Sequence, residues 1–146
     1  MTDQSPDGIP IPDHVRAFLD DTRYATISTL DPDGMPRPAV IWYSVDGDEI
    51  TINSAAGRRW PTNLLRDPRM SLTVIDAVDA YRWVGMTGTA RPVGDQTAAQ
   101  ADIAAMARRY RTDPDEAEEA ITKTYQRQER ISFRFRPQTI YDYDDR

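Results

Sequence analysis

The chain has 146 residues, a length typical of one domain and sufficient to bury a core without disulfides or metals. It has no cysteine and one histidine, His14, which excludes disulfides, thiolate zinc sites, thiol nucleophiles and multi-histidine metal sites. Acidic residues outnumber basic ones, 24 to 18, and the net charge of -6 argues against a nucleic-acid partner. No apolar run reaches the length of a membrane span, and no signal peptide is recognisable, so we expect a cytoplasmic protein.

The chain ends are expected to lie outside one central domain. Residues 1–12 contain three prolines and a glycine, which predicts a flexible N-terminal arm. We expect a single domain over residues 13–143 and a tail at 144–146. Asp13 should cap a short first helix. The buried face of this helix is predicted to carry Val15, Phe18 and Leu19.

Alternating and β-branched residues predict an antiparallel sheet through most of the chain. The expected strands are 24–30, 38–45, 49–53, 70–75, 81–90 and 130–136, with a further short strand at 139–143 after a break at Pro137. Turns are predicted at 31–34 and at Asp46-Gly47. Gly85 and Gly88 lie within one strand, which indicates a bulge or a close backbone approach.

Two longer helices are predicted late in the sequence, where glycine is absent after residue 94. One spans residues 96–110, and the other begins after Asp113 and runs to about residue 126. Strands joined by tight turns, with few helices, favour a mainly β (α+β) fold and a small antiparallel barrel over a parallel sheet.

The segment 54–68 combines features of an anion-binding site. Small residues follow a strand, and Arg58 and Arg59 then precede a short helix in which Trp60 is the boundary residue and Pro61 the first residue. The free N–H groups at a helix N-terminus attract anions, and guanidinium groups bind phosphate or carboxylate through paired donors. The segment therefore predicts a clamp for phosphate or polycarboxylate; the alternative is a surface helix with solvated arginines.

Residues 26–74 also resemble a known family. The motifs that match are TLDPDG, a P-x-P entry to a strand containing Trp42, the DGD hairpin and GRRWPTNLLRDPR. They are similar to the pyridoxamine 5'-phosphate oxidase-like superfamily, and within it to the actinobacterial group that uses the deazaflavin coenzyme F-420. The resemblance implies a split β-barrel homodimer with cofactor sites at the subunit interface, and a small-molecule substrate.

The resemblance also assigns candidate cofactor-binding residues. They are Arg37, Pro38, Val40, Ile41, Trp42, Asn53, Ser54, Ala55, Ala56, Gly57, Arg58, Arg59 and Asn63. Within this set, the strand residues would lie beside the deazaflavin ring, and Arg58 and Arg59 would neutralise the phosphodiester. Flavin-binding relatives often carry a lysine beside the motif arginine, so the Arg-Arg pair favours F-420 over FMN.

The function that follows is hydride transfer between F-420 and a small, unsaturated organic substrate, with the cofactor supplying the chemistry. Three alternatives stay open: an FMN-dependent oxidase or reductase, a protein that binds F-420 or a flavin without turnover, and an interaction domain with an empty cleft. No metal site or catalytic residue is assigned; Tyr43 is considered as a proton donor, but packing is the favoured role. Trp42, Tyr81 and Trp83 fit a core, a substrate pocket or a subunit interface equally well.

Overall fold

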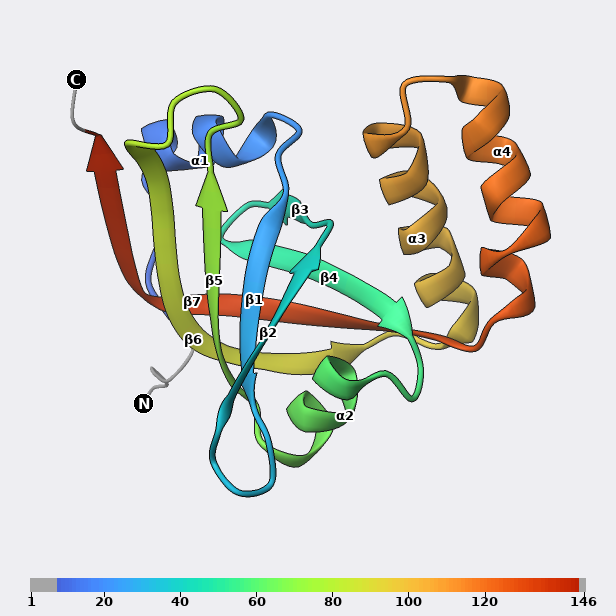
Figure 1. Cartoon of the computed structure of the whole chain (residues 1–146), viewed down its shortest axis with the longest axis horizontal. Coiled ribbons are helices and arrows are strands. Elements are labelled where there is room, and N and C mark those ends of the chain that lie inside the picture. The colour runs from blue at the N-terminus through green and yellow to red at the C-terminus, as the bar shows by residue number, and fades with distance from the viewer. Residues whose placement is uncertain (1–7, 145–146) are drawn as a thin grey trace.

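The computed structural model describes residues 8–144 as a curled antiparallel sheet with helices around it (Figure 1). Its seven strands are β1 (Ala25–Leu30), β2 (Pro36–Ile41), β3 (Ser44–Asp46), β4 (Glu49–Ala55), β5 (Arg69–Ile75), β6 (Arg82–Val93) and β7 (Arg130–Asp144). The helices of this described part are α1 (Asp13–Asp20), α2 (Arg59–Arg66), α3 (Gln96–Tyr110), α4 (Pro114–Lys123) and the short 3-10 helix η2 (Tyr125–Arg127).

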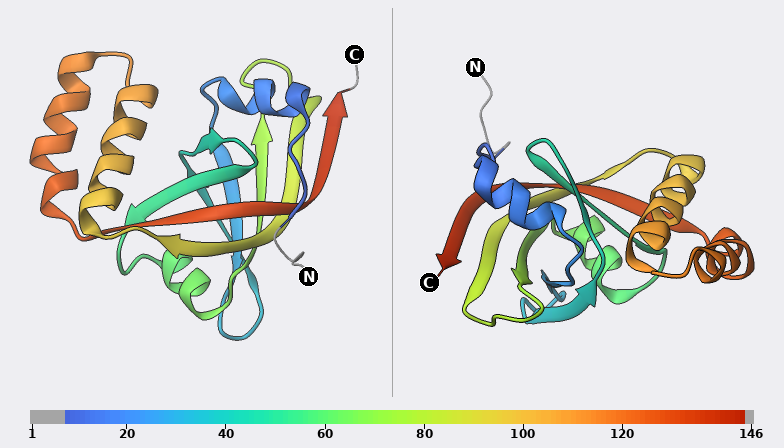
Figure 2. Two further views of the ribbon diagram at one scale, coloured as in Figure 1. Left: turned by 180° about the vertical axis from the view of Figure 1, so that it is seen from behind. Right: turned by 90° about the horizontal axis from the view of Figure 1, so that it is seen from above.

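The strands are arranged in the order β2-β1-β5-β6-β7-β4-β3, with antiparallel neighbours. The long strands β6 and β7 bend together, so the sheet curls over on itself to form a barrel (Figures 1 and 2). Helix α1 lies across one end of the barrel, and α2 lies near the other end. Helices α3 and α4 form an antiparallel pair beside it, next to the end of β4 and the start of β7.

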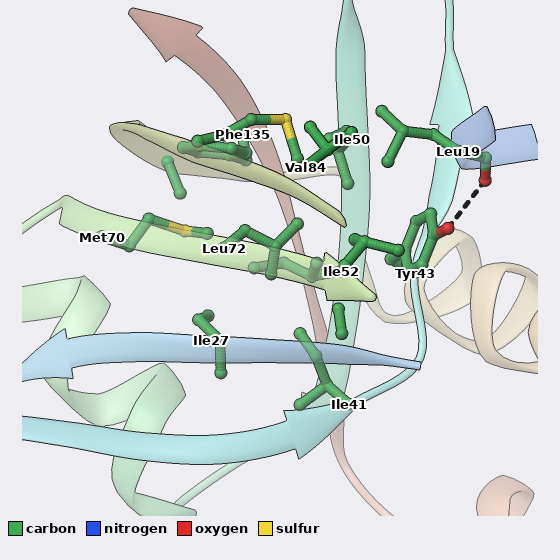
Figure 3. Packing of buried hydrophobic residues seen from close by; sticks show 14 of the residues in the cluster. Leu19, Ile27, Ile41, Tyr43, Ile50, Ile52, Met70, Leu72, Val84 and Phe135 are labelled. Carbon is green, nitrogen blue, oxygen red and sulfur yellow. Dashed lines mark hydrogen bonds between the residues drawn. The ribbon is translucent and has the colours of Figure 1, made fainter. Parts of the chain in front are cut away.

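The barrel interior is filled by the apolar face that alternates along each strand. Ile27, Ile52, Leu72, Phe133 and Phe135 are completely buried there, as Figure 3 shows for several of them. Helix α1 closes the barrel with its predicted apolar face, consisting of Val15, Phe18 and Leu19. The prediction that Asp13 caps this helix is wrong: Asp13 is the first helical residue, and its carboxylate pairs with Arg16 one turn later.

The strand predicted over residues 38–45 is two strands, because the chain departs from the sheet at Trp42 and Tyr43. Tyr43 turns its ring into the core, and its backbone N–H donates to the Tyr110 hydroxyl of α3 at 3.2 Å. The β-branched and aromatic residues of segment 38–45 favour one continuous strand. The contact with α3 divides this segment into β2 and β3.

The predicted break at Pro137 is a bulge inside a continuous strand. Thr87 pairs with Thr139 and Gly88 pairs with Pro137, so β7 accommodates one extra residue and continues to Asp144. Gly88 meets the β7 backbone so closely that an added Cβ would lie 2.2 Å from the Arg136 carbonyl oxygen. The predicted close approach at this glycine is confirmed.

Other boundaries differ by a few residues. Helix α3 has the predicted bounds, and Asp113 caps α4 as expected, but α4 ends at Lys123 and is followed by η2. Residues 1–7 and 145–146 of the expected arm and tail lie outside the described residues. The rest of the expected arm packs on the domain, since Ile11 is 2% exposed and the Ile9 N–H donates to the Pro137 carbonyl. Across residues 8–144, no helix is both long and apolar enough to span a membrane.

Candidate cofactor site

The loop from β4 to α2 forms one end of the site. The strand ends at Ala55, and Gly57 turns the chain with φ +91°, a conformation that residues with a Cβ rarely adopt. Helix α2 then begins at Arg59, two residues earlier than predicted, so Pro61 is its third residue. No side chain caps this helix, which leaves the N–H groups of Arg59 and Trp60 available to a ligand.

A cavity of about 520 Å³ lies between this loop, β2 and α3. Such a volume is within the range of cofactor and small-molecule sites. Its lining consists of Tyr24, Arg37, Pro38, Ala39, Val40, Ile41, Trp42, Asn53, Ser54, Arg58, Arg59, Trp60, Ile103, Met106, Tyr125 and Arg130. All four charged residues of this lining are arginines, so the cavity wall is strongly positive in an acidic protein.

Arg130 is the most buried of these arginines, with 7% of its surface exposed. Its Nε and one terminal nitrogen donate to Oδ1 of Asn53 at 3.0 and 2.8 Å, and its guanidinium lies over the Tyr125 ring. Within residues 8–144, it forms no ion pair with a carboxylate. Burial, and secondarily the nearby Arg58, lower the pKa of Arg130 to about 10. A buried cation held only by neutral groups favours an anionic ligand.

Arg37 and Arg59 are connected through a carboxylate behind the cavity wall. Asp31, at the end of β1, accepts two hydrogen bonds from Arg37 and one from Arg59. Asn63 of α2 donates to the same carboxylate at 3.0 Å and to the Thr29 hydroxyl at 3.1 Å. The hydrogen bonds from Arg37 and then Asn63 hold the pKa of Asp31 far below its ordinary value. The sequence indicated a turn residue here and gave no sign of this role.

The side of the cavity near α3 is aromatic and apolar. Trp42 stacks on Tyr110 with ring centroids 5.0 Å apart, and Tyr125 meets Trp42 edge-on at 6.5 Å. Ile103 and Met106 of α3 complete this wall. The cavity therefore combines four arginines, two of them at the β4–α2 junction, with an aromatic and apolar wall suited to a flat conjugated ring.

Tyr43 does not belong to this wall. Its ring is completely buried, and its hydroxyl donates to the Leu19 carbonyl at 2.8 Å, as Figure 3 shows. Burial raises the pKa of Tyr43 above its ordinary value. Packing, the favoured role, is what the structure shows for this residue. Tyr81 and Trp83 lie elsewhere too: Trp83 stacks with Tyr141 and Tyr143 on the outer face of β6 and β7.

Nine of the thirteen predicted site residues line the cavity. Ala55, Ala56 and Gly57 shape the loop without lining it, and Ala56 lines a neighbouring cavity of about 530 Å³. Asn63 is buried and acts through Asp31. The lining residues that the sequence reasoning missed are Tyr24, Ala39, Trp60, Ile103, Met106, Tyr125 and Arg130. Arg130 is visible in the sequence as a charged residue at the start of the final strand, but nothing around it indicates that it reaches the cavity.

The family of the chain follows from a sequence comparison. The model of the pyridoxamine 5'-phosphate oxidase family matches residues 11–143, nearly the whole domain. The chain belongs to this family. The curled antiparallel sheet is accordingly the split barrel of pyridoxamine 5'-phosphate oxidase-like proteins, as the resemblance implied. A search among curated proteins gives no match.

Several solved structures of different proteins share this fold. An F-420 reductase is 23% identical with a TM-score of 0.71, and the match covers 90% of this chain and 98% of that one. The conserved hypothetical protein Rv2991 from Mycobacterium tuberculosis is 26% identical with a TM-score of 0.76, covering 99% and 91%. The heme storage protein HutZ from Vibrio cholerae is 16% identical with a TM-score of 0.67, covering 92% and 96%.

Proposed function

We propose that this protein is an oxidoreductase that transfers a hydride between coenzyme F-420 and a small unsaturated organic substrate. The observation that carries the proposal is the all-arginine charge of the cavity, in which the buried Arg130 lines the wall and pairs with no carboxylate of residues 8–144. F-420 combines a flat deazaflavin ring with a phosphodiester and an oligoglutamate tail. The aromatic wall and the arginines of the cavity match these two parts, and an F-420 reductase shares the fold.

The residues present fit such a cofactor in a definite division of roles. Arg58, Arg130 and the free N–H groups at the start of α2 would hold the phosphodiester and the first carboxylates. Val40 and Ile41 of β2 would lie against the ring, with the aromatic wall around Trp42 excluding water from the reacting face. When bound, the cofactor supplies the hydride chemistry. The buried Tyr43 hydroxyl donates to the Leu19 carbonyl, so this tyrosine would not supply the accompanying proton.

A second copy of the chain would cover the open side of this cavity. The outer face of the sheet presents two rows of paired residues without a charged side chain. These rows are Val40-Thr26-Thr73-Gly85-Tyr141 and Pro38-Ser28-Ser71-Thr87-Thr139. Val40 lines the cavity and is 71% exposed, so the face is continuous with the site. Because charged residues are depleted at the core of subunit interfaces, the absence of charge from these rows supports the proposed dimer.

The proposed function is tested by mixing the purified protein with reduced F-420 and a panel of conjugated enones and quinones. Absorbance of the oxidised deazaflavin should appear with at least one substrate. Tight F-420 binding without turnover across the panel would instead support the alternative of a carrier protein. The proposed interface is tested separately by sedimentation of Thr73→Glu, which should be monomeric, against Thr122→Glu on the exposed face of α4, which should remain dimeric.

A further inference from the structure

Asp31 lies behind the cavity wall and does not line it, yet it contacts two of the four cavity arginines. Only 8% of its surface is exposed. One carboxylate oxygen accepts from Nε and a terminal nitrogen of Arg37 at 3.1 and 2.8 Å. The other oxygen accepts from Arg59 at 3.2 Å and from Asn63 at 3.0 Å. The two arginines come from different elements, β2 and α2, and Asp31 connects them.

We propose that Asp31 is a positioning residue, which fixes the guanidinium groups of Arg37 and Arg59 in the orientation that binds the anionic part of the ligand. This inference rests on the proposed function, because it requires the cavity to bind an anion. It assigns to the 31–34 turn a role in binding as well as in reversing the chain.

The physical reason is that two neighbouring guanidinium groups repel each other, and each has several free rotamers when nothing holds it. A single buried carboxylate offsets that repulsion and limits the rotamers before the ligand arrives, which lowers the entropic cost of binding. Arg58 and Arg130 make no hydrogen bond to Asp31, so their contribution to binding should not depend on it.

The sign of the mutational effect distinguishes this role from simple electrostatics. Asp31 is a negative charge close to an anion site, so a bystander in that position would weaken anion binding. Its removal would then tighten binding several-fold. A positioning residue gives the opposite result, because loss of the oriented arginines outweighs the gain in net positive charge. Residues that orient metal ligands in the same way are typically worth about tenfold or more in metal affinity, and we expect a similar factor here.

The experiment compares Asp31→Asn with Asp33→Asn. Asp33 lies in the same turn and carries the same charge, but its carboxylate accepts the Met35 N–H at 3.0 Å and acts on Arg37 through Coulomb attraction without a hydrogen bond. Affinity for F-420 and for inorganic pyrophosphate is measured by fluorescence and calorimetry, and thermal unfolding of each variant is recorded. We expect Asp31→Asn to lower the affinity for both ligands about tenfold. Asp33→Asn should bind both ligands with the affinity of the unmodified protein or slightly more tightly.

A double-mutant cycle separates positioning from damage to the fold. In the Arg59→Ala background, Asp31→Asn should reduce affinity less than it does in the unmodified protein. In the Arg58→Ala background, Asp31→Asn should reduce affinity as much as it does in the unmodified protein. If Asp31→Asn does not fold, Asp31→Ser takes its place in the same cycle. Equal or tighter binding by the Asp31 variant, with normal binding by the unmodified protein, overturns the positioning role alone. No binding of either ligand by the unmodified protein overturns the proposed function and this inference together.

Discussion

The guanidinium of Arg130 is held by the side-chain oxygen of Asn53 through two hydrogen bonds, at 3.0 and 2.8 Å. The amide orientation of Asn53 is fixed from the other side, because its NH₂ group donates to the Ala99 carbonyl and to the Ser132 hydroxyl. Ser132 in turn donates to Asp102 of α3 at 2.7 Å. A neutral acceptor thus orients the buried arginine without neutralising it, and the full charge of Arg130 remains available to a ligand.

The first prediction concerns the cost of this arrangement. Arg130→Gln keeps a donor for Asn53 but removes the buried charge, so the ligand-free protein should become more stable, by about 1 kcal/mol. Affinity for F-420 should fall at the same time, by roughly 1.5–3 kcal/mol. Urea unfolding and ligand titration of the same preparation check both effects. A variant that loses stability and keeps its affinity would show that Arg130 is a structural residue.

The second prediction concerns the loop arginines. Replacing Arg58 and Arg59 together by alanine should weaken F-420 binding by about 3 kcal/mol or more, because each loses a charge-assisted hydrogen bond worth roughly 1.5–3 kcal/mol. The fold should survive, since both side chains are exposed. Arg108→Ala is the matched control: Arg108 pairs with Glu118 on the helices beside the barrel and does not line the cavity. Unchanged affinity of the double variant would rule out the clamp.

The third prediction compares two glycines of β6. Gly88→Ala should destabilise the fold by about 2–3 kcal/mol, because its Cβ would collide with the Arg136 carbonyl oxygen of β7, a backbone atom. Gly85→Ala should cost about 1 kcal/mol, since its Cβ would meet the edge of the Trp83 ring at 2.9 Å, and a side chain can shift. Urea unfolding of both variants measures the difference; an equal cost at the two positions would contradict the bulge geometry.

The fourth prediction concerns acid stability. The hydrogen bond from Arg23 lowers the pKa of Asp76 to about 2, from its ordinary value of 3.8. The folded state therefore favours the ionised carboxylate, and this contribution is complete above about pH 4 and lost as the pH falls towards 2. The urea midpoint of unfolding should decrease when the pH is lowered from about 6 to about 2.5. In Asp76→Asn this decrease should be smaller. The pKa of Asp67 is also lowered to about 2, so the Asp76→Asn variant should still lose part of its stability in acid.

Local patterns predicted the elements well, because the signals that define them are local. Helix α3 has the predicted bounds, and Asp113 accepts from the Asp115 N–H as a cap should. The anion-binding loop is also contiguous in sequence, so Arg58 and Arg59 were visible as a pair beside small residues.

The contacts that complete the site come from distant segments and have no local signature. Arg130 is 77 positions away in the sequence from Asn53, the residue that holds it. Asp31 has the appearance of an ordinary turn residue beside a proline. The division between β2 and β3 likewise depends on Tyr110 of α3, which bonds to the backbone of Tyr43. Contacts between residues far apart in the sequence determine these three features, and the local sequence pattern around each residue does not reveal those contacts.

The central claim is that this cavity binds a deazaflavin through its arginines. It is tested most directly by fluorescence titration of the ligand-free protein with F-420 and, in parallel, with FMN. We predict saturable F-420 binding, clearly tighter than that of FMN and weakened by Arg130→Gln. Tighter binding of FMN would place the protein among flavin-dependent members of its family, and no binding of either cofactor would contradict the assignment of the cavity.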